Sequence, residues 1–380
     1  MLNIGEYRNK ADRLADLLPW VALIAPGVVL NKDGSFQRTV RFRGPDLEGA
    51  TEAELVGLCA RANNALKRLG SGWALFFDAE RLEAQHYPSS EFRDAASWLV
   101  DEERRAAFEE GRQGQHFESR YHLTLLYMPP PDAQARTENA LLERDRKGEG
   151  AGGIRNWRQE LARFGEETER VLDLLSGFLP EIRALDDAET LTFLHGTIST
   201  KRHPVNVPET LMYLDGVLVD TPLIGGLEPM LGEKHLRTLT ILGFPNTTRP
   251  GILDALNHQD FVYRWVTRFI PLDKTAATKV LTRLRRQWFA KRKSITAVLR
   301  EVLTNEAAPL VDSDADNKAA DADAALQDLG GDYVGYGYLT TSINVLHPDA
   351  AIADARIAQI RSGEKPALAP DANANYFAEV

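Results

Sequence analysis

The chain of 380 residues has little cysteine, no surplus of positive charge and no long apolar run. Its single cysteine, Cys59, excludes an internal disulfide framework and fits a reducing compartment. A net charge of −10 argues against a protein that grips nucleic acid over a wide basic face. The apolar stretch at residues 17–30 covers only 14 residues, whereas a membrane-spanning helix needs about 20. Residues 1–14 carry mixed charges and no secretory signal, so we expect a cytoplasmic protein.

Patterns typical of catalytic and metal sites are also missing. The eight histidines show no spacing typical of metal ligands: His195 and His203 lie eight residues apart, and no cysteine assists them. Ser71 does not lie in the G-x-S-x-G motif of hydrolases. The Gly-Lys dipeptide that a nucleotide-binding phosphate loop requires does not occur in this chain. We therefore predict no catalytic, cofactor-binding or metal site here.

The composition, 43% hydrophobic and 26% charged, is that of a folded globular protein. A chain of this length is expected to form two or more subdomains. The polar, glycine-rich residues 132–153 predict a connection between an N-terminal subdomain, residues 1–131, and a second one, residues 154–361. Strand-like and helix-like segments alternate in both, which predicts an α/β (α+β) fold with helices packed on sheets. Residues 362–380, rich in alanine and proline, predict a flexible tail.

Residues 27–43 predict a β-hairpin. Two strand-like runs, residues 27–30 and 36–42, flank a turn that contains Asp33 and Gly34, a pair that supplies the positive φ angles of tight turns. Alternation in the second run predicts a half-buried strand. Its apolar face would hold Phe36, Val40 and Phe42, interrupted by Arg38, and its polar face Gln37, Thr39, Arg41 and Arg43.

A helix is predicted to begin at a capping box formed by Thr51 and Glu54, in which each side chain bonds the other's free backbone donor. Apolar residues then recur at steps of three and four up to Leu69, which indicates one buried stripe. Cys59 lies on this stripe, so we expect a buried thiol rather than a nucleophile.

The long helix predicted at residues 273–303 carries the strongest basic patch of the chain. A solvated face opposite a buried side that includes Trp288 explains this pattern, and contact with phosphate, an acidic partner or anionic lipid headgroups is the alternative. An acidic run at residues 312–323 would neutralise part of it. The candidate partner-contact residues are Arg283, Arg285, Arg286, Lys291, Arg292 and Lys293.

The hairpin motif, DGSFQRT followed by FRGPDL at residues 33–47, resembles the N-terminal region of the TrbE-type conjugation ATPases. These form part of the CagE/TrbE/VirB family of type IV secretion systems. Further segments add to the resemblance, which spans roughly residues 2–361. They are EYRNKADRLADLLPW at residues 6–20, GSGWALFFDAER at 70–81, YHLTLLYMPP at 121–130 and RTLTILGFP at 237–245.

The resemblance implies an ATPase that energises assembly of, and transport through, a cell-envelope channel. Its N-terminal region would dock on inner-membrane components and on other copies of itself, and a C-terminal motor would bind ATP and Mg²⁺. Because the phosphate loop is absent, we expect this chain to be the docking region, peripherally associated with the bacterial inner membrane and not catalytic alone. A truncated reading of a full ATP-hydrolysing enzyme and a nucleic-acid-binding module that uses the basic patch remain alternatives.

Overall fold

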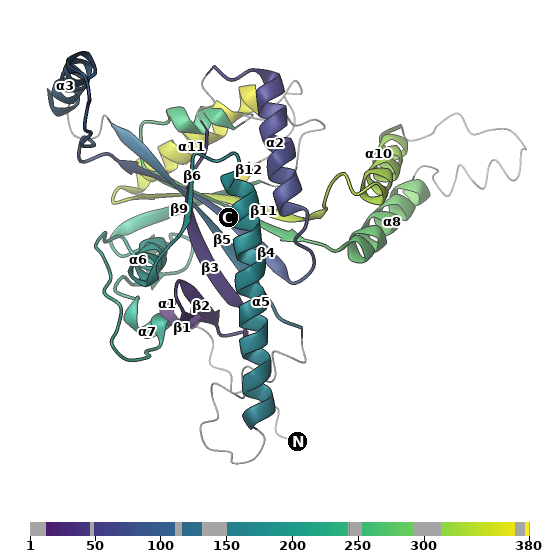
Figure 1. Ribbon diagram of the computed structural model, residues 1–380. Helices are drawn as coiled ribbons and strands as arrows, with labels where there is room; N and C mark the ends of the chain where they lie inside the picture. The colour runs from purple at the N-terminus through teal and green to yellow at the C-terminus, as the bar shows by residue number, and fades with distance from the viewer. Residues whose placement is uncertain are drawn as a thin grey trace, which may run out of the picture.

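The computed structural model describes residues 13–45, 49–110, 116–130, 150–241, 243, 253–291, 313–368 and 377–379. Their strands form one sheet in the order β1-β2-β3-β5-β4-β10-β11-β9-β8-β7, with β6 paired to β3 and β12 to β9 (Figure 1). Each pair of neighbouring strands in this sheet is antiparallel. Helices packed on an antiparallel sheet confirm the predicted α+β class.

The strands are β1 (Trp20–Ala25), β2 (Val28–Asn31), β3 (Phe36–Arg43), β4 (Trp73–Glu83), β5 (Phe117–Tyr127), β6 (Glu181–Ala184), β7 (Leu223–Ile224), β8 (Met230–Leu231), β9 (Lys234–Ile241), β10 (Tyr263–Pro271), β11 (Gly337–His347) and β12 (Phe377–Glu379). The helices are α1 (Leu14–Leu17), α2 (Glu52–Leu66), α3 (Ala95–Glu110), α5 (Gly150–Ser176), α6 (Asp187–Ile198), α7 (Leu214–Val217), the 3₁₀ helix η2 (Asp254–His258), α8 (Lys274–Lys291), α10 (Ser313–Gly330) and α11 (Ala350–Leu368).

The sheet joins the two regions of the chain that the sequence divided. Strand β4 pairs with β10 over seven positions, from Tyr263 opposite Arg81 to Phe269 opposite Leu75. The predicted connection at 132–153 lies outside the described residues, except that 150–153 begin α5. The division into two subdomains at residues 132–153 stays a prediction. Within the range expected to be a flexible tail, α11 extends to Leu368 and β12 pairs with β9.

The predicted hairpin is formed by β2 and β3, with Leu30 opposite Phe36. Gly34 adopts a φ of 79°, a conformation that costs glycine little. The Asp33 carboxylate accepts hydrogen bonds from the backbone N–H and the hydroxyl of Ser35, at 3.0 and 2.6 Å, and these bonds fix the turn.

One face of the sheet is covered by α5 and α2 (Figure 1). Phe164 of α5 is fully buried and packs on Phe36, Trp73 and Tyr127, with ring centroids 5.7 to 6.4 Å apart. Aromatic contacts of this kind add stability beyond the area that they bury. The capping box at the start of α2 is present, because Thr51 accepts from the Glu54 backbone N–H and the Glu54 side chain accepts from the Thr51 backbone.

The predicted polar face of β3 is exposed at Arg41 and Arg43, as expected, but it is covered at Gln37 and Thr39, which corrects the prediction for the first half of the strand. Gln37 is 6% exposed and Thr39 is fully buried, and the Thr39 hydroxyl lies 2.9 Å from that of Thr124 on β5. Helices α6 and α7 pack on this side, with Leu191 and Leu194 among the buried side chains. The Thr39 hydroxyl is therefore paired by a hydrogen bond instead of meeting water.

A second correction concerns Cys59, which is exposed on α2. The buried stripe of this helix runs through Ala65 and on to Leu69 just beyond its end, so the thiol lies on the rim of the contact with α5 and the sheet. A periodic pattern gives the apolar face of a helix but not how deeply its edge is covered.

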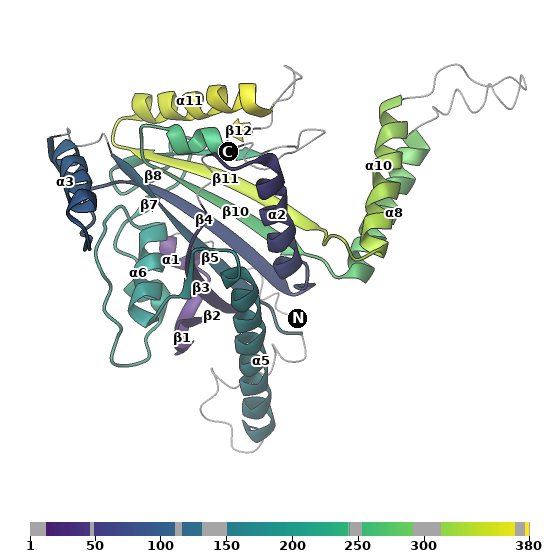
Figure 2. The same ribbon diagram turned by 45° about the horizontal axis from the view of Figure 1, so that its top comes forward.

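Two segments of the structure extend away from the sheet. Figure 2 shows α8 and α10 side by side as an arm on one side, and α3 on the opposite side. Helix α11 and η2 instead cover the sheet at β9, β10 and β11, where Ile357 and Ile360 are buried. Among the described helices, none combines the length and the apolar composition that crossing a bilayer would require.

Candidate functional site

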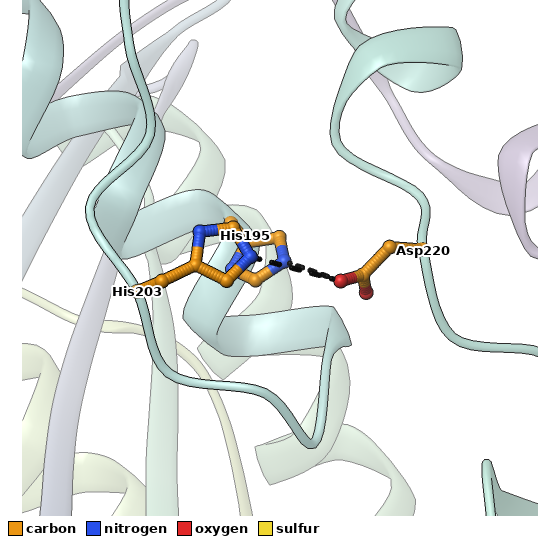
Figure 3. A group of neighbouring side chains, drawn as sticks. All are labelled: His195, His203 and Asp220. Carbon is orange, nitrogen blue, oxygen red and sulfur yellow. Dashed lines mark ion pairs between the residues drawn. The ribbon is translucent and has the colours of Figure 1, made fainter.

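The structure brings together three potential metal ligands from separate segments of the chain: His195, His203 and Asp220 (Figure 3). His195 lies near the end of α6 and is 3% exposed, His203 lies on the segment that follows, and Asp220 lies just after α7. The Asp220 Oδ2 atom is 3.2 Å from His195 Nε2 and 3.8 Å from His203 Nε2. The two imidazole rings face each other with centroids 4.5 Å apart.

The Asp220 carboxylate is held in its charged form. Burial acts to raise its pKa, but hydrogen bonds from the hydroxyls of Ser199 and Thr221, at 2.7 and 2.8 Å, hold the pKa well below its usual range. Lys201 adds a positive charge, with its Nζ atom 3.3 Å from Oδ2. Asp220 is therefore an anion near neutral pH, as a metal ligand must be.

The orientation of His203 is set by its own backbone neighbourhood. Its Nδ1 atom lies 3.1 Å from the carbonyl oxygen of Pro204. A carbonyl oxygen can only accept, so Nδ1 carries a proton, and in the neutral imidazole Nε2, which lies 3.8 Å from Asp220, then presents a lone pair. This is the tautomer that a metal-binding histidine adopts when its other nitrogen is held by a carbonyl group.

Helix α6 carries His195, and contacts at the start of this helix fix its position. Asp186 caps the helix and forms a capping box with Glu189, and Arg183 donates two hydrogen bonds of 2.7 Å to the Glu189 carboxylate. These bonds, the one from Arg183 first, lower the pKa of Glu189 to about 2. Near its start, Asp187 accepts from the backbone N–H of Gly27 at 2.7 Å, which ties α6 to the loop before β2.

A buried network of charges lies between α6 and the sheet, next to the histidine–aspartate cluster. Arg264 on β10 contacts Asp78 at 2.7 Å and donates to the Gly196 carbonyl of α6 at 2.8 Å. Glu80 on β4 accepts from Arg202 at 2.6 Å, which anchors the segment that carries His203. Burial raises the pKa of Asp78, and the attraction of Arg264 acts against this rise.

His122 on β5 lies opposite Asp78, between the sheet and α6, and is 9% exposed. Burial, followed by repulsion from Arg264, Arg41 and other arginines, lowers its pKa to about 4. The imidazole is therefore neutral at physiological pH, and it packs on Phe193 of α6 with ring centroids 4.5 Å apart.

Some of the basic residues predicted to form a partner-contact patch on α8 are exposed, whereas Arg285 is already paired within the chain. Arg285 forms an ion pair of 2.7 Å with Asp323 on α10, as the neighbouring acidic run suggested. Trp288 is half-buried, and the Lys318 ammonium lies 4.6 Å from its ring centroid. Arg283 and Arg286 are exposed and line an open hollow of about 550 Å³ along α8. The side chain of Lys291 is not described, and Arg292 and Lys293 lie outside the described residues.

Sequence spacing did not reveal the histidine–aspartate cluster. Asp220 follows His203 after a segment in which the short helix α7 is the only described regular element, and the fold of this segment places Asp220 beside His195 (Figure 3). Spacing rules apply to ligands on one helix, one turn or one loop, so they do not bear on residues that folding brings together. No signal in the sequence singled out Asp220.

Comparison of the sequence with known proteins places this chain in a family. The model of the type IV secretion system ATPase VirB4/TrbE N-terminal domain matches residues 27–135, and the model of the CagE, TrbE, VirB family, component of type IV transporter system, matches residues 175–308. A short probable conjugal transfer protein TrbE of Sinorhizobium fredii is 39% identical over 132 residues, which cover 34% of this chain and 87% of that relative. The chain belongs to the VirB4/TrbE family.

Two longer members of the VirB4/TrbE family are also similar. The conjugal transfer protein TrbE of Rhizobium radiobacter is 31% identical over 364 residues, which are 92% of this chain and 43% of that protein. The type IV secretion system protein virB4 of Brucella melitensis is 24% identical over 297 residues, or 73% of this chain and 35% of that protein. The chain thus spans less than half the length of these two relatives. The VirB4/TrbE N-terminal match includes β2 to β5, and the second match includes the histidine–aspartate cluster.

Proposed function

We propose that this chain is the N-terminal docking and assembly region of a TrbE-like conjugal transfer ATPase. It binds inner-membrane subunits of a type IV secretion system and further copies of itself, and it lies on the cytoplasmic side of the bacterial inner membrane. ATP and Mg²⁺ are bound by a motor outside these 380 residues. Two facts support this proposal together. The chain aligns with 43% of the length of a conjugal transfer TrbE protein, and its sequence contains no Gly-Lys pair for a phosphate loop.

The projecting helix α3 supports a docking role. It has no buried residue, and its Trp98, Leu99 and Val100 are 54%, 55% and 48% exposed. Helix α3 contacts the segments before and after it, because Asp101 accepts a hydrogen bond of 2.7 Å from Tyr87 and Phe108 stacks on His116. Exposed apolar side chains that lie close together are typical of a protein-binding surface.

The first experiment tests the absence of a motor. The purified chain is incubated with Mg²⁺ and ATP, and phosphate release is measured over time. We expect release at the background rate, since no backbone loop of this sequence can cradle the phosphates beside a lysine. Steady turnover that co-purifies with the chain and is lost on its removal would refute a docking region without a motor.

The second experiment tests docking itself. Inner-membrane vesicles are prepared from donor cells with and without the transfer system, and sedimentation of the added chain is measured. We expect sedimentation only with vesicles that contain the system. The variant Leu99→Asp should lose it, whereas Val56→Asp on α2, a similarly exposed position at 54%, should retain it. Failure of the wild-type chain to sediment would refute docking, and equal binding of both variants would exclude α3 as its surface.

A further inference from the structure

We propose that His195, His203 and Asp220 bind a divalent transition metal ion, Zn²⁺ being the best chemical match, and that this ion fixes the segment after α6 in place. The proposal does not depend on the docking role. It departs from the expectation, drawn from sequence spacing, that the chain holds no metal. Two imidazole nitrogens and one carboxylate oxygen form a donor set that Zn²⁺ accepts.

The distances between the candidate ligand atoms are close to those of a metal site. The candidate ligand atoms all lie within 4.8 Å of one another, and His195 Nε2 and Asp220 Oδ2 are 3.2 Å apart. Zinc–ligand bonds of about 2.0 Å in a tetrahedron place neighbouring ligand atoms about 3.3 Å apart. The distance from His203 Nε2 to Asp220 Oδ2 is 3.8 Å, so a small movement of the exposed His203 ring completes the geometry.

The buried histidine can meet Asp220 in two ways, depending on which of its nitrogens carries the proton. The Nε2 atom of His195 is buried, and the Asp220 Oδ2 atom lies 3.2 Å from it. When Nε2 carries the proton, it can donate to this oxygen, a contact that helps to lower the pKa of Asp220. If this nitrogen instead carries a lone pair, it faces an anionic oxygen and the two repel each other. A cation between them removes this repulsion and satisfies both atoms.

The surroundings leave room for a fourth ligand. The His203 side chain is 52% exposed and that of Asp220 is 27% exposed, so the cluster opens to solvent on the side away from His195. With three protein ligands, the fourth position would be filled by water. Lys201 contacts the same carboxylate oxygen, but its side chain is 60% exposed and can turn into solvent when a metal ion binds.

Metal binding would join three segments of the chain: the end of α6, the stretch that carries His203, and the stretch that follows α7. The region between them includes exposed apolar side chains, such as Leu211 at 75%. In the structure this region is anchored by the contact of Arg202 with Glu80 and by the hydroxyl bonds to Asp220. A metal ion adds a link that is lost when a chelator is added.

The direct test is zinc binding by the full, tag-free chain after removal of metal by a chelator. ZnCl₂ is titrated in competition with a chromophoric chelator, and Co²⁺ absorption reports on coordination geometry. We expect one equivalent per chain. His203→Ala should weaken binding by about 100-fold or more, because even second-shell changes cost 10- to 100-fold. The exposed His86 provides the matched control His86→Ala, which should bind like the wild type.

A second ligand variant guards against a folding artefact. Asp220→Asn keeps the size of the side chain and can still accept from Ser199 and Thr221, but it removes the anionic ligand. We expect it to bind zinc weakly while its circular dichroism without metal matches the wild type. Lys201→Gln should bind zinc several-fold more tightly, because a competing positive charge is removed. No zinc uptake by the wild type, or unchanged uptake by both ligand variants, would overturn the proposed site.

Limited trypsin digestion tests the effect on the segment. Lys201 is exposed between His195 and His203, so cleavage after it reports on this stretch. We expect zinc to slow this cleavage several-fold in the wild type but not in His203→Ala. Cleavage after the exposed Arg93 is the internal control and should not change. Zinc uptake that leaves cleavage after Lys201 unchanged would overturn the claim that the ion fixes the segment.

Discussion

The buried His122 should make the stability of this protein sensitive to mild acid. Its pKa is lowered to about 4 in the folded state, whereas histidine in an unfolded chain has a pKa of about 6.5. Below pH 6.5 the unfolded chain therefore binds a proton that the folded chain does not. The stabilisation is fully present above pH 6.5 and is lost as the pH falls toward 4.

The expected magnitude follows from the shift. One pKa unit corresponds to about 1.36 kcal/mol, so the full effect is about 3.4 kcal/mol, of which about 2 kcal/mol is lost between pH 7 and pH 5. The physical cause is burial first and then repulsion by arginines on β5 itself and on other strands of the sheet. These are Arg264 on β10, Arg41 on β3, Arg120 on β5 and Arg183 on β6.

The assay is urea unfolding, followed by tryptophan fluorescence, at several pH values between 7 and 5. His122→Gln removes the titrating group and keeps a polar side chain. Between pH 7 and pH 5, the variant should therefore lose about 2 kcal/mol less of its free energy of unfolding than the wild type loses. His86→Gln, at an exposed position, should follow the wild type. Asp78, the cross-strand neighbour of His122, has a raised pKa, so its titration stabilises the folded chain as the pH falls and opposes the effect of His122 in both proteins. Parallel curves for His122→Gln and the wild type would refute the reasoning.

Three further predictions concern packing and exposure. Arg264→Met leaves the buried Asp78 without its cation and should lower the free energy of unfolding by about 3–5 kcal/mol in urea titrations, a loss that Asp78→Asn in the same chain should partly reverse. Phe164→Ala opens a cavity between α5 and the sheet and should cost about 3–5 kcal/mol, with a fall in the thermal midpoint; a change below about 1 kcal/mol would contradict the core contacts. Cys59 should react with a thiol reagent in the native protein nearly as fast as in urea, whereas strong protection would place it in the core after all.

The sequence predicted those features that short segments decide. The turn at Gly34 needs a positive φ, and Asp33 and Ser35 lie close enough in the chain to bond each other. The capping box of Thr51 and Glu54 is local in the same way. Family membership was also legible, because it depends on residue identity along the chain and not on contacts in space.

Tertiary structure alone decided which surfaces are covered and which distant residues meet. Alternation along β3 predicted one solvent-exposed face, which holds for Arg41 and Arg43, but Gln37 and Thr39 on the same face are buried. Periodicity along α2 predicted a buried Cys59, but the neighbouring elements stop short of it. His203 and Asp220 approach His195 only because of the path that the chain takes after α6. Local propensity depends on neighbours in sequence, whereas burial and site geometry depend on contacts between segments that sequence order does not specify.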